Sequence, residues 1–413
     1  MSPFTINGRS YLLNRFVQTL PATDLIAWLE SQILYPKVFW KEQDSPIVRA
    51  AVGSLLQFSQ IPQFSGAAPF DVRLYGGIQF CKNHQKDKTW QGFPKRCFWL
   101  PKIEISQEEK QAQIVSYSVG TPATAESLEI PAFPRREEFP SLIKQTHSPG
   151  KESWQSNVDS VLHSIASGGL DKLVLARKTS LEFTSSLSPW PILSRLCNRA
   201  QAATLFAFQL SPHLCFLGAT PEKLFQREGD LFNTDAVAAT RPRGKTSEED
   251  LQLEIDLLTS GKEQREFRFV KDYLHSALIP LSEEMKWEEA DRVIKGSHVQ
   301  HLYNRLKATL KHSISDSDLI HTLHPTPSLG GYPRKEALDL LREMEPFDRG
   351  WYGAPLGVIG NQKTSLYVAI RSALIQERSM HLFAGTGLVP GSTAEREWEE
   401  LEQKIRPFME LFF

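Results

Sequence analysis

Strand-like segments dominate the chain from residue 172 onward, and they constrain the fold more than any other feature. Six runs of alternating apolar, β-branched and aromatic residues follow one another there, and two more precede residue 106. Only 262–278 and 393–406 have convincing helical periodicity. Short connections favour antiparallel pairing, so we expect an α/β or α+β fold with a large sheet component. The predicted strands are 73–80, 97–105, 172–183, 204–210, 214–218, 230–238, 365–374 and 379–384.

The stretch 106–152 differs in composition from its surroundings. It is rich in Ser, Thr and Glu and carries five prolines, which predicts loops or an excursion over the surface. We place the boundary between an N-terminal part, 1–145, and a C-terminal part, 146–413, within this stretch.

Charge and cysteine usage exclude several classes of protein. The 47 Lys and Arg residues nearly balance the 48 Asp and Glu residues, which argues against a nucleic-acid binder. Neither a signal peptide nor an apolar stretch long enough for a membrane span is recognisable, so we expect a cytoplasmic protein. The cysteines are far apart and never in a C-x-x-C spacing, so we expect neither a zinc ribbon nor a disulfide framework: Cys81, Cys97, Cys197 and Cys215.

Both predicted helices turn an E-x-x-E pair toward their buried side. At 100° per residue, Glu263 and Glu266 lie within about 60° of each other, on the side of the apolar stripe. Glu397 and Glu400 repeat this arrangement, together with Lys404. Buried carboxylates need partners, and two such pairs could jointly hold Mg²⁺, which prefers oxygen ligands. The alternative is that they are ordinary glutamates on charge-rich helix surfaces.

The second helix has clear boundary signals. Ser392 followed by Glu395 fits a capping box, and Pro407 predicts the end of the helix.

Two glycine-containing turns and three side chains are further candidates for a binding site. We expect 239–244 and 385–387 to follow strands and to expose amides to an anion, and Arg371, in a strand, to clamp a carboxylate. Lys172 shares a strand face with apolar residues, where a lowered pKa would suit a general base. Glu222 lies in a turn as a candidate acid. The alternatives are that the glycine segments are ordinary tight turns, that Arg371 forms a surface salt bridge, and that the side chains of Lys172 and Glu222 are solvated.

Taken together and in order, these segments closely resemble the chorismate-utilising enzymes: isochorismate, salicylate, anthranilate and aminodeoxychorismate synthases. The resemblance covers about 150–407, and the N-terminal third is similar to the isochorismate synthase branch of the menaquinone pathway. The motifs are KLVLARK (172–178), FLGATPEKLF (216–225), TDAVAATRPRG (234–244), LLTSGKEQREF (257–267), HPTPSLGGYPRKEAL (324–338), RGWYGAPLG (349–357), YVAIRSAL (367–374) and AGTGLVPGSTAEREWEELEQK (384–404).

The resemblance implies a catalytic assignment. Family members that attack chorismate with water have lysine at the position of Lys172, so it implies that Lys172 activates water for attack at C2. Glu222 is then the acid that protonates the departing C4 hydroxyl. Further positions match Mg²⁺ ligands (Glu266, Glu400), carboxylates near the metal (Glu263, Glu397) and contacts to the substrate carboxylates (Ala239, Thr240, Tyr352, Arg371, Gly385, Lys404).

The resemblance also implies the architecture and the partners. The fold of anthranilate synthase component I is one large domain of two packed, mostly antiparallel sheets with helices outside, so 1–145 and 146–413 are expected to form one structural domain. We expect chorismate as substrate, Mg²⁺ as the only cofactor, and neither a glutaminase subunit nor a membrane partner. The oligomeric state stays open, although monomers are common among members with this lysine.

Two positions depart from the family pattern. Ala239 stands where glycine is usual, and its methyl group could narrow the approach to the substrate if φ there is positive. Phe267 stands where histidine usually follows the metal-ligand glutamate, which removes a polar neighbour of the metal site.

The leading interpretation is therefore an isochorismate synthase, an isomerase of the hydroxymutase type. We expect it to act in menaquinone biosynthesis. The alternatives are a salicylate synthase, which also eliminates pyruvate, and a homologue that binds chorismate without catalysis. An aminating synthase is disfavoured by Lys172.

Overall fold

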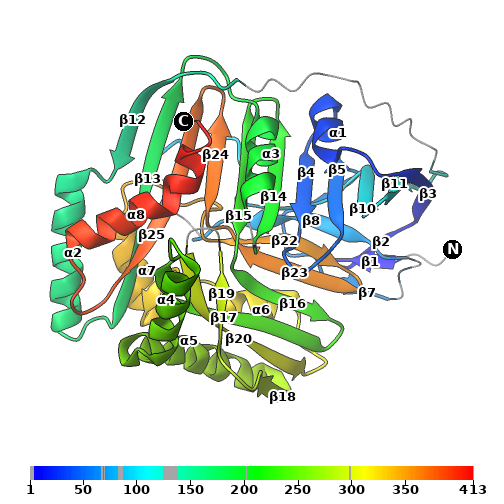
Figure 1. Cartoon of the computed structure of the whole chain (residues 1–413). Helices are drawn as coiled ribbons and strands as arrows, with labels where there is room; N and C mark the ends of the chain where they lie inside the picture. Colours follow the sequence, from blue (N-terminus) through cyan, green and yellow to red (C-terminus); the bar gives the residue numbers. More distant parts are fainter. Residues whose placement is uncertain are drawn as a thin grey trace.

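The computed structural model, which describes residues 4–66, 68, 70–81, 87–123, 138–200, 202–296 and 299–412, contains two large antiparallel sheets (Figure 1). In these residues the larger sheet has twelve strands, with β21 (Gly331–Tyr332) paired only to β13. The others lie in the order β12 (Leu142–Ser148), β13 (Lys172–Phe183), β25 (Ser379–Leu388), β24 (Ser372–Gln376), β15 (Leu214–Thr220), β14 (Thr204–Ser211), β4 (Lys37–Lys41), β5 (Val48–Val52), β10 (Ile103–Glu108), β11 (Gln111–Val119) and β3 (Leu13–Pro21).

The second sheet has ten strands in the described residues, with β19 (Arg292–Lys295) paired only to β20. Their order is β18 (Ser282–Trp287), β20 (Val299–Leu310), β17 (Leu231–Pro242), β16 (Lys223–Glu228), β23 (Lys363–Val368), β22 (Pro355–Gly360), β8 (Arg73–Ile78), β9 (Arg96–Leu100) and β6 (Leu56–Phe58). A small sheet near the N-terminus consists of β2 (Arg9–Tyr11), β1 (Phe4–Ile6) and β7 (Phe64–Ser65).

Helices pack against both large sheets. The twelve-stranded sheet carries α1 (Leu25–Ser31), α2 (Lys151–Ala166), α3 (Pro189–Arg199), α7 (Arg334–Met344) and α8 (Ala394–Met409). Figure 1 shows α4 (Ser247–Thr259) and α5 (Gly261–Leu278) at the opposite side, along β17 and β20, with α6 (Asp316–Leu323) against α5. A short 3₁₀ helix, Ile279–Leu281, follows α5. None of the described helices is long and apolar enough to cross a membrane.

The space between the sheets is filled largely by aromatic side chains. Trp40, Phe206 and Phe208 come from the twelve-stranded sheet, and Tyr75 and Tyr367 come from the ten-stranded sheet. All five side chains are at most 1% exposed. Such rings bury large apolar areas and contact one another edge to face. The expected fold class, two packed antiparallel sheets with helices outside, is confirmed. Both 1–145 and 146–413 contribute strands to both sheets; their union in one structural domain stays a prediction.

Two predicted strands are wrong because each is in fact a pair of strands in different sheets. The run 97–105 consists of β9 and β10, and the run 365–374 consists of β23 and β24. In both cases the chain crosses from the ten-stranded to the twelve-stranded sheet. Because both sheets face the same core, the apolar pattern continues through the crossing and hides it. Arg371 therefore lies between strands, with φ of +50°, and not in a strand as expected.

The expectation of loops over 106–152 is also wrong in part. Strand β11 and the end of β10 lie in its first third, and β12 lies near its end. These strands are near or at the sheet edge, where polar side chains face water, so their composition resembles that of loops. Residues 124–137 lie outside the described part of the chain.

The boundaries of the second predicted helix differ from expectation. Thr393 caps α8 by accepting a hydrogen bond from the Arg396 amide at 3.5 Å, whereas Ser392 accepts one from Val389. Pro407 lies inside the helix, which continues to Met409. Phe408, 3% exposed, packs the last turn onto the core. The first predicted helix is confirmed as α5, whereas sequence periodicity did not reveal the six other α-helices of the described residues.

Candidate active site

A cavity of about 450 Å³ lies where β13, β25 and β17 meet the helices α5 and α8. All twelve residues expected at the site line this cavity, although they come from widely separated segments of the chain. They are Lys172, Glu222, Ala239, Thr240, Glu263, Glu266, Tyr352, Arg371, Gly385, Glu397, Glu400 and Lys404. The structure thus brings the predicted set together; the chemical role of each residue stays a prediction.

Lys172 begins β13, as the alternating pattern predicts. Its side chain is 14% exposed, and its Nζ lies 3.6 Å from Glu266 Oε1. On the adjacent strand, a Cβ on Gly387 would lie only 2.7 Å from Lys172 Cε. The glycine therefore leaves the space through which the ammonium reaches the cavity.

Glu222 lies in the turn between β15 and β16 and is half-buried in the cavity. Burial raises its pKa to about 7, although Lys172, Lys404 and Arg371 act in the opposite direction. Its backbone is fixed on both sides, because its amide donates to Thr220 Oγ1 at 3.2 Å and its carbonyl accepts from the Val368 amide at 2.9 Å. A carboxyl group with this pKa is about half protonated at pH 7, and the protonated form is able to donate.

Helix α5 supplies two carboxylates in different environments. Its N-cap Ser260 accepts from the Glu263 amide, so the helix begins just before these residues. The Glu263 side chain is 8% exposed and forms an ion pair with Arg241 at 2.7 Å. The side chain of Glu266 is 43% exposed and faces Lys172. As the helical spacing predicts, both point into the cavity.

Helix α8 supplies the other two carboxylates and an ammonium group. Thr386 donates a hydrogen bond to Glu397 Oε2, and Lys404 forms an ion pair with Glu400 one turn away. Burial lowers the pKa of Lys404, although Glu400 opposes this shift. Burial alone would raise the pKa of Glu400, but Lys404 holds it below its ordinary value. Lys404 Nζ also donates to the Gly385 carbonyl at 2.9 Å, which ties α8 to β25.

The four glutamates fit a sparsely ligated Mg²⁺ better than a cage made of protein alone. In the described residues, no three His, Cys, Asp or Glu side chains are grouped closely enough to hold a metal ion together. Mg²⁺ usually takes only one or two carboxylates and keeps oxygens from water or substrate. Glu266 and Glu400 are the most exposed of the four, and their present partners are lysines that a cation can replace.

Arg371 and Tyr352 form a further part of the wall. The guanidinium of Arg371 acts on the pKa of Glu222, Lys404 and His301, so it lies among the ionisable groups. Tyr352 is 5% exposed, and burial raises its pKa to about 12. A Cβ on Gly385 would lie 3.1 Å from the Tyr352 hydroxyl. A cation and a neutral hydroxyl beside a glycine can bind a carboxylate.

One of the two predicted glycine turns lies wholly within a strand and the other partly so, since only Arg243 and Gly244 of 239–244 follow the strand. Gly385 to Gly387 lie within β25, and Ala239 to Pro242 lie within β17. A register shift between Ala238 and Thr240 bulges β17 at Ala239, whose φ is +56°. Bulges are common beside binding sites because they redirect a strand locally. The positive φ explains why glycine would suit this position better than alanine.

His301 also lines the cavity, and sequence reasoning missed it. It lies on β20 opposite Thr240, and its Nδ1 is 3.0 Å from Thr240 Oγ1 and 3.3 Å from the Ala239 carbonyl. Burial and Arg371 lower its pKa to about 4, so the imidazole is neutral at pH 7. Because His301 and Thr240 are 61 residues apart, only the strand register reveals this contact.

Phe267, the second departure from the family pattern, is 1% exposed and belongs to the main hydrophobic core. It is not among the described residues that line the cavity.

The model of the chorismate binding enzymes matches residues 61–412. The chain belongs to this family. Isochorismate synthase MenF from Bacillus subtilis is 29% identical over 99% of this chain and 90% of that protein. Isochorismate synthase MenF from Haemophilus influenzae is 31% identical over 97% of this chain and 92% of that protein. Within the chorismate binding enzymes, the chain therefore groups with the isochorismate synthase branch.

Solved structures agree on the fold of this chorismate binding enzyme. The menaquinone-specific isochorismate synthase MenF from Escherichia coli superposes with a TM-score of 0.84 at 24% identity, over 98% of this chain and 96% of that one. Anthranilate synthase component I from Streptococcus pneumoniae superposes with a TM-score of 0.69 at 19% identity, over 95% and 92% of the two chains.

Proposed function

We propose that this chain is an isochorismate synthase that converts chorismate to isochorismate. Water adds at C2 of the ring and the hydroxyl group leaves from C4, so the reaction is an isomerisation without a redox cofactor. The relatives of the chain support this activity. The observation that carries the mechanism is the placement of Lys172 and Glu222 in one cavity, where burial raises the pKa of Glu222 to about 7.

The proton transfers follow from these two groups. Lys172 Nζ accepts a proton from water as the oxygen bonds to C2. Both ring double bonds shift, from C1=C2 to C1=C6 and from C5=C6 to C4=C5, as the C4–O bond breaks and the Glu222 carboxyl gives its proton to the departing hydroxyl. One proton is taken and one is given, so the overall reaction is balanced. A positioned acid or base typically contributes about 10²- to 10⁴-fold to the rate.

The remaining side chains bind and orient the substrate. Arg371, Tyr352 and Gly385 suit the enolpyruvyl carboxylate, and Lys404 and Thr240 suit the ring carboxylate. Glu266 and Glu400 would hold Mg²⁺, with Glu263 and Glu397 beside them. When bound, the metal neutralises the charge of the ring carboxylate and orients the ring.

Incubation of the purified protein with chorismate, with and without Mg²⁺, tests the proposal. We expect isochorismate only when Mg²⁺ is present, identified by chromatography and mass spectrometry. Salicylate and pyruvate formed without a second enzyme would instead indicate a salicylate synthase. Unchanged chorismate would indicate a homologue that binds without catalysis. An aminated product formed with ammonium salts would overturn water as the nucleophile.

The pathway is part of the proposal. The relatives are named MenF, and one solved structure with this fold is menaquinone-specific, which supports a role in menaquinone biosynthesis. Deletion of the gene should then lower the cellular menaquinone content, and external isochorismate should restore it.

A further inference from the structure

The strand that carries Lys172 has an incomplete edge close to this residue. Along one edge of β13, pairing with β12 extends from Phe183 only to Lys178, and pairing with β21 covers only Lys172 and Leu173. Between these two partners, no described strand pairs with this edge. Buried backbone groups without a partner are costly, so the segment needs another source of hydrogen bonds.

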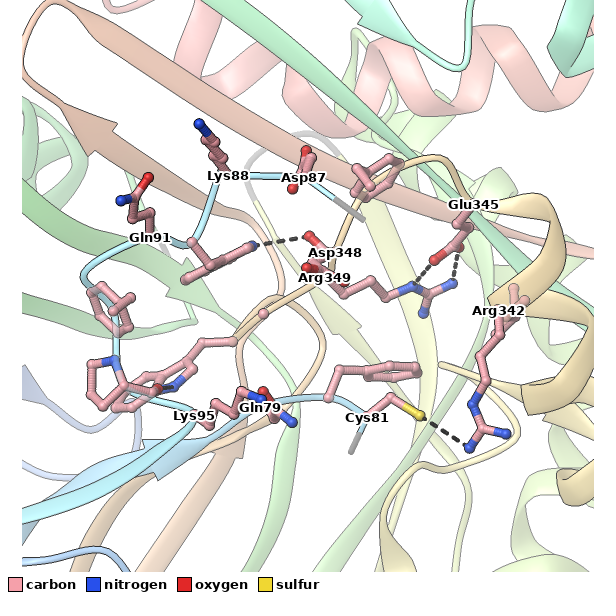
Figure 2. Close-up of a pocket in the computed structure, with 18 of the residues that line it drawn as sticks. Gln79, Cys81, Asp87, Lys88, Gln91, Lys95, Arg342, Glu345, Asp348 and Arg349 are labelled. Carbon is pink, nitrogen blue, oxygen red and sulfur yellow. Dashed lines mark hydrogen bonds and ion pairs between the residues drawn. The ribbon is translucent and has the colours of Figure 1, made fainter. Parts of the chain in front are cut away.

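Side chains supply these hydrogen bonds. The Ala176 amide donates to Glu345 Oε1 at 2.9 Å, and Arg349 Nη2 donates to the Val174 carbonyl at 2.7 Å. Figure 2 shows the ion pair between Glu345 and Arg349, in which Arg349 Nε donates to Glu345 Oε2 at 2.8 Å. Both side chains are 4% exposed. A buried ion pair thus takes the place of a neighbouring strand.

The same guanidinium also fixes the segment that contacts this edge of β13 beside Lys172. Arg349 Nη1 donates to the Leu329 carbonyl at 2.7 Å, and the Val174 amide donates to the Gly330 carbonyl at 3.0 Å. The next residue, Gly331, approaches so closely that a Cβ on it would lie 2.3 Å from the Lys172 carbonyl oxygen. Arg349 therefore joins β13 to the segment that packs directly against Lys172.

We propose that Glu345 and Arg349 are positioning residues that hold the strand of Lys172 in the place its role requires. This inference rests on the proposed function, because it assigns Lys172 the role of base. Arg349 also lines the active-site cavity, so the ion pair adjoins the site. A small displacement of a catalytic group has a large effect, since a misplacement of about 1 Å can reduce turnover about 10²-fold.

Arginine is required for its shape as well as for its charge. Its planar fork reaches Glu345, Val174 and Leu329 at the same time. A lysine ammonium is a single point of charge on a flexible stem and cannot make these contacts together. Arg349→Lys therefore keeps a cation beside Glu345 but releases at least one of the two backbone segments.

The test compares Arg349→Lys with Arg73→Lys. Arg73 makes a similar fork on the buried Glu104, with Nε at 3.0 Å and Nη2 at 2.6 Å, and lines neither the active-site cavity nor the cavity of Figure 2. We expect comparable losses of thermal stability, but only Arg349→Lys should lower kcat, by about 10- to 100-fold, with KM for chorismate within about 3-fold of wild type. The kcat of Glu345→Asp, which keeps the charge, should lie between those of the two arginine variants. This variant replaces Arg349→Lys in the test if Arg349→Lys does not fold.

Hydrogen exchange of residues 172–177, followed by mass spectrometry, provides a readout that does not depend on activity. We expect at least about 10-fold faster exchange in Arg349→Lys or Glu345→Asp than in wild type, and no change in Arg73→Lys. Unchanged exchange, or a kcat equal to that of Arg73→Lys, would overturn the positioning role. A wild-type protein that forms no isochorismate would instead contradict the proposed function.

Discussion

Two cavities on either side of Arg349 have very different walls. The active-site cavity is lined by ionisable groups of both signs, among them Lys172, Glu222 and Arg371. The cavity of Figure 2, of about 390 Å³, also has charged residues in its wall, but it differs in its group of five aromatic side chains, among them Trp90 and Phe93. Charged groups gathered in one cavity serve chemistry at the expense of stability, whereas stacked rings serve packing. The comparison predicts that substitutions in the first cavity reduce activity and substitutions in the second reduce stability.

Lys172→Ala should have the largest effect on activity. Loss of the base should lower kcat by about 10³-fold or more, because no other group is expected to accept the proton from water. Stability should change by less than about 1 kcal/mol, since the ammonium has one long ion pair with the exposed Glu266. Steady-state kinetics and thermal unfolding measure both quantities.

Lys178→Ala is the matched control for this prediction. Lys178 lies on the same strand, but it pairs with Asp87, which lines the cavity of Figure 2. Its removal should leave kcat within about 3-fold of wild type, because it touches no part of the proposed site. Full activity of Lys172→Ala, or equal losses in the two variants, would contradict the assignment of the base.

Glu222→Gln should follow, with a loss of about 10²- to 10³-fold in kcat. In the wild type, activity should fall as the pH rises through about 7, because the acid then loses its proton. A wild-type profile without this alkaline limb would argue against Glu222 as the acid.

The raised pKa of Glu222 also affects stability. Between its ordinary value of 4.5 and about 7, the folded protein binds more protons than the unfolded chain. Stability should therefore fall as the pH rises through this interval, and the glutamine variant should gain stability relative to wild type from about pH 5 to pH 8. Denaturant unfolding at several pH values tests this; an equal difference between the two proteins at every pH would contradict it.

Phe93→Ala should show the opposite behaviour from Lys172→Ala. Phe93 is 7% exposed and its ring centroid lies 4.8 Å from that of Trp351. Truncation of a buried phenylalanine typically lowers the free energy of unfolding by about 3–5 kcal/mol. The kcat of the folded protein should remain within about 3-fold of wild type. A large loss of kcat without a loss of stability would mean that the two cavities do not differ in the way described.

Ala239→Gly should have the smallest effect. Glycine relieves the strain of a φ of +56° but loses more conformational entropy on folding, so we expect a net gain of about 0.5–1 kcal/mol in unfolding free energy. Ala238→Gly, one residue earlier and without positive φ, should instead destabilise the protein by about 0.5–1 kcal/mol. If both substitutions destabilise the protein equally, the bulge stores no strain at Ala239.

The sequence predicted the site more completely than the path of the chain. The family motifs identified the residues that line the cavity, because such residues recur in fixed order. The crossings at 101–102 and 369–371 were not predictable from periodicity, because both flanking strands are buried. Pro407 was misleading because the packing of Phe408 outweighs the missing amide. His301, Glu345 and Arg349 act through contacts with remote segments, so no local pattern reveals their role.

In the mechanism that we propose, the charged cavity adds water at C2 of chorismate. The most direct test is turnover of chorismate by the wild-type protein with Mg²⁺ in ¹⁸O-labelled water, with the product analysed by mass spectrometry. We expect isochorismate with one ¹⁸O atom, located in the C2 hydroxyl group. Isochorismate without the label would mean that the hydroxyl group migrates within the substrate, and would contradict the roles proposed for Lys172 and Glu222.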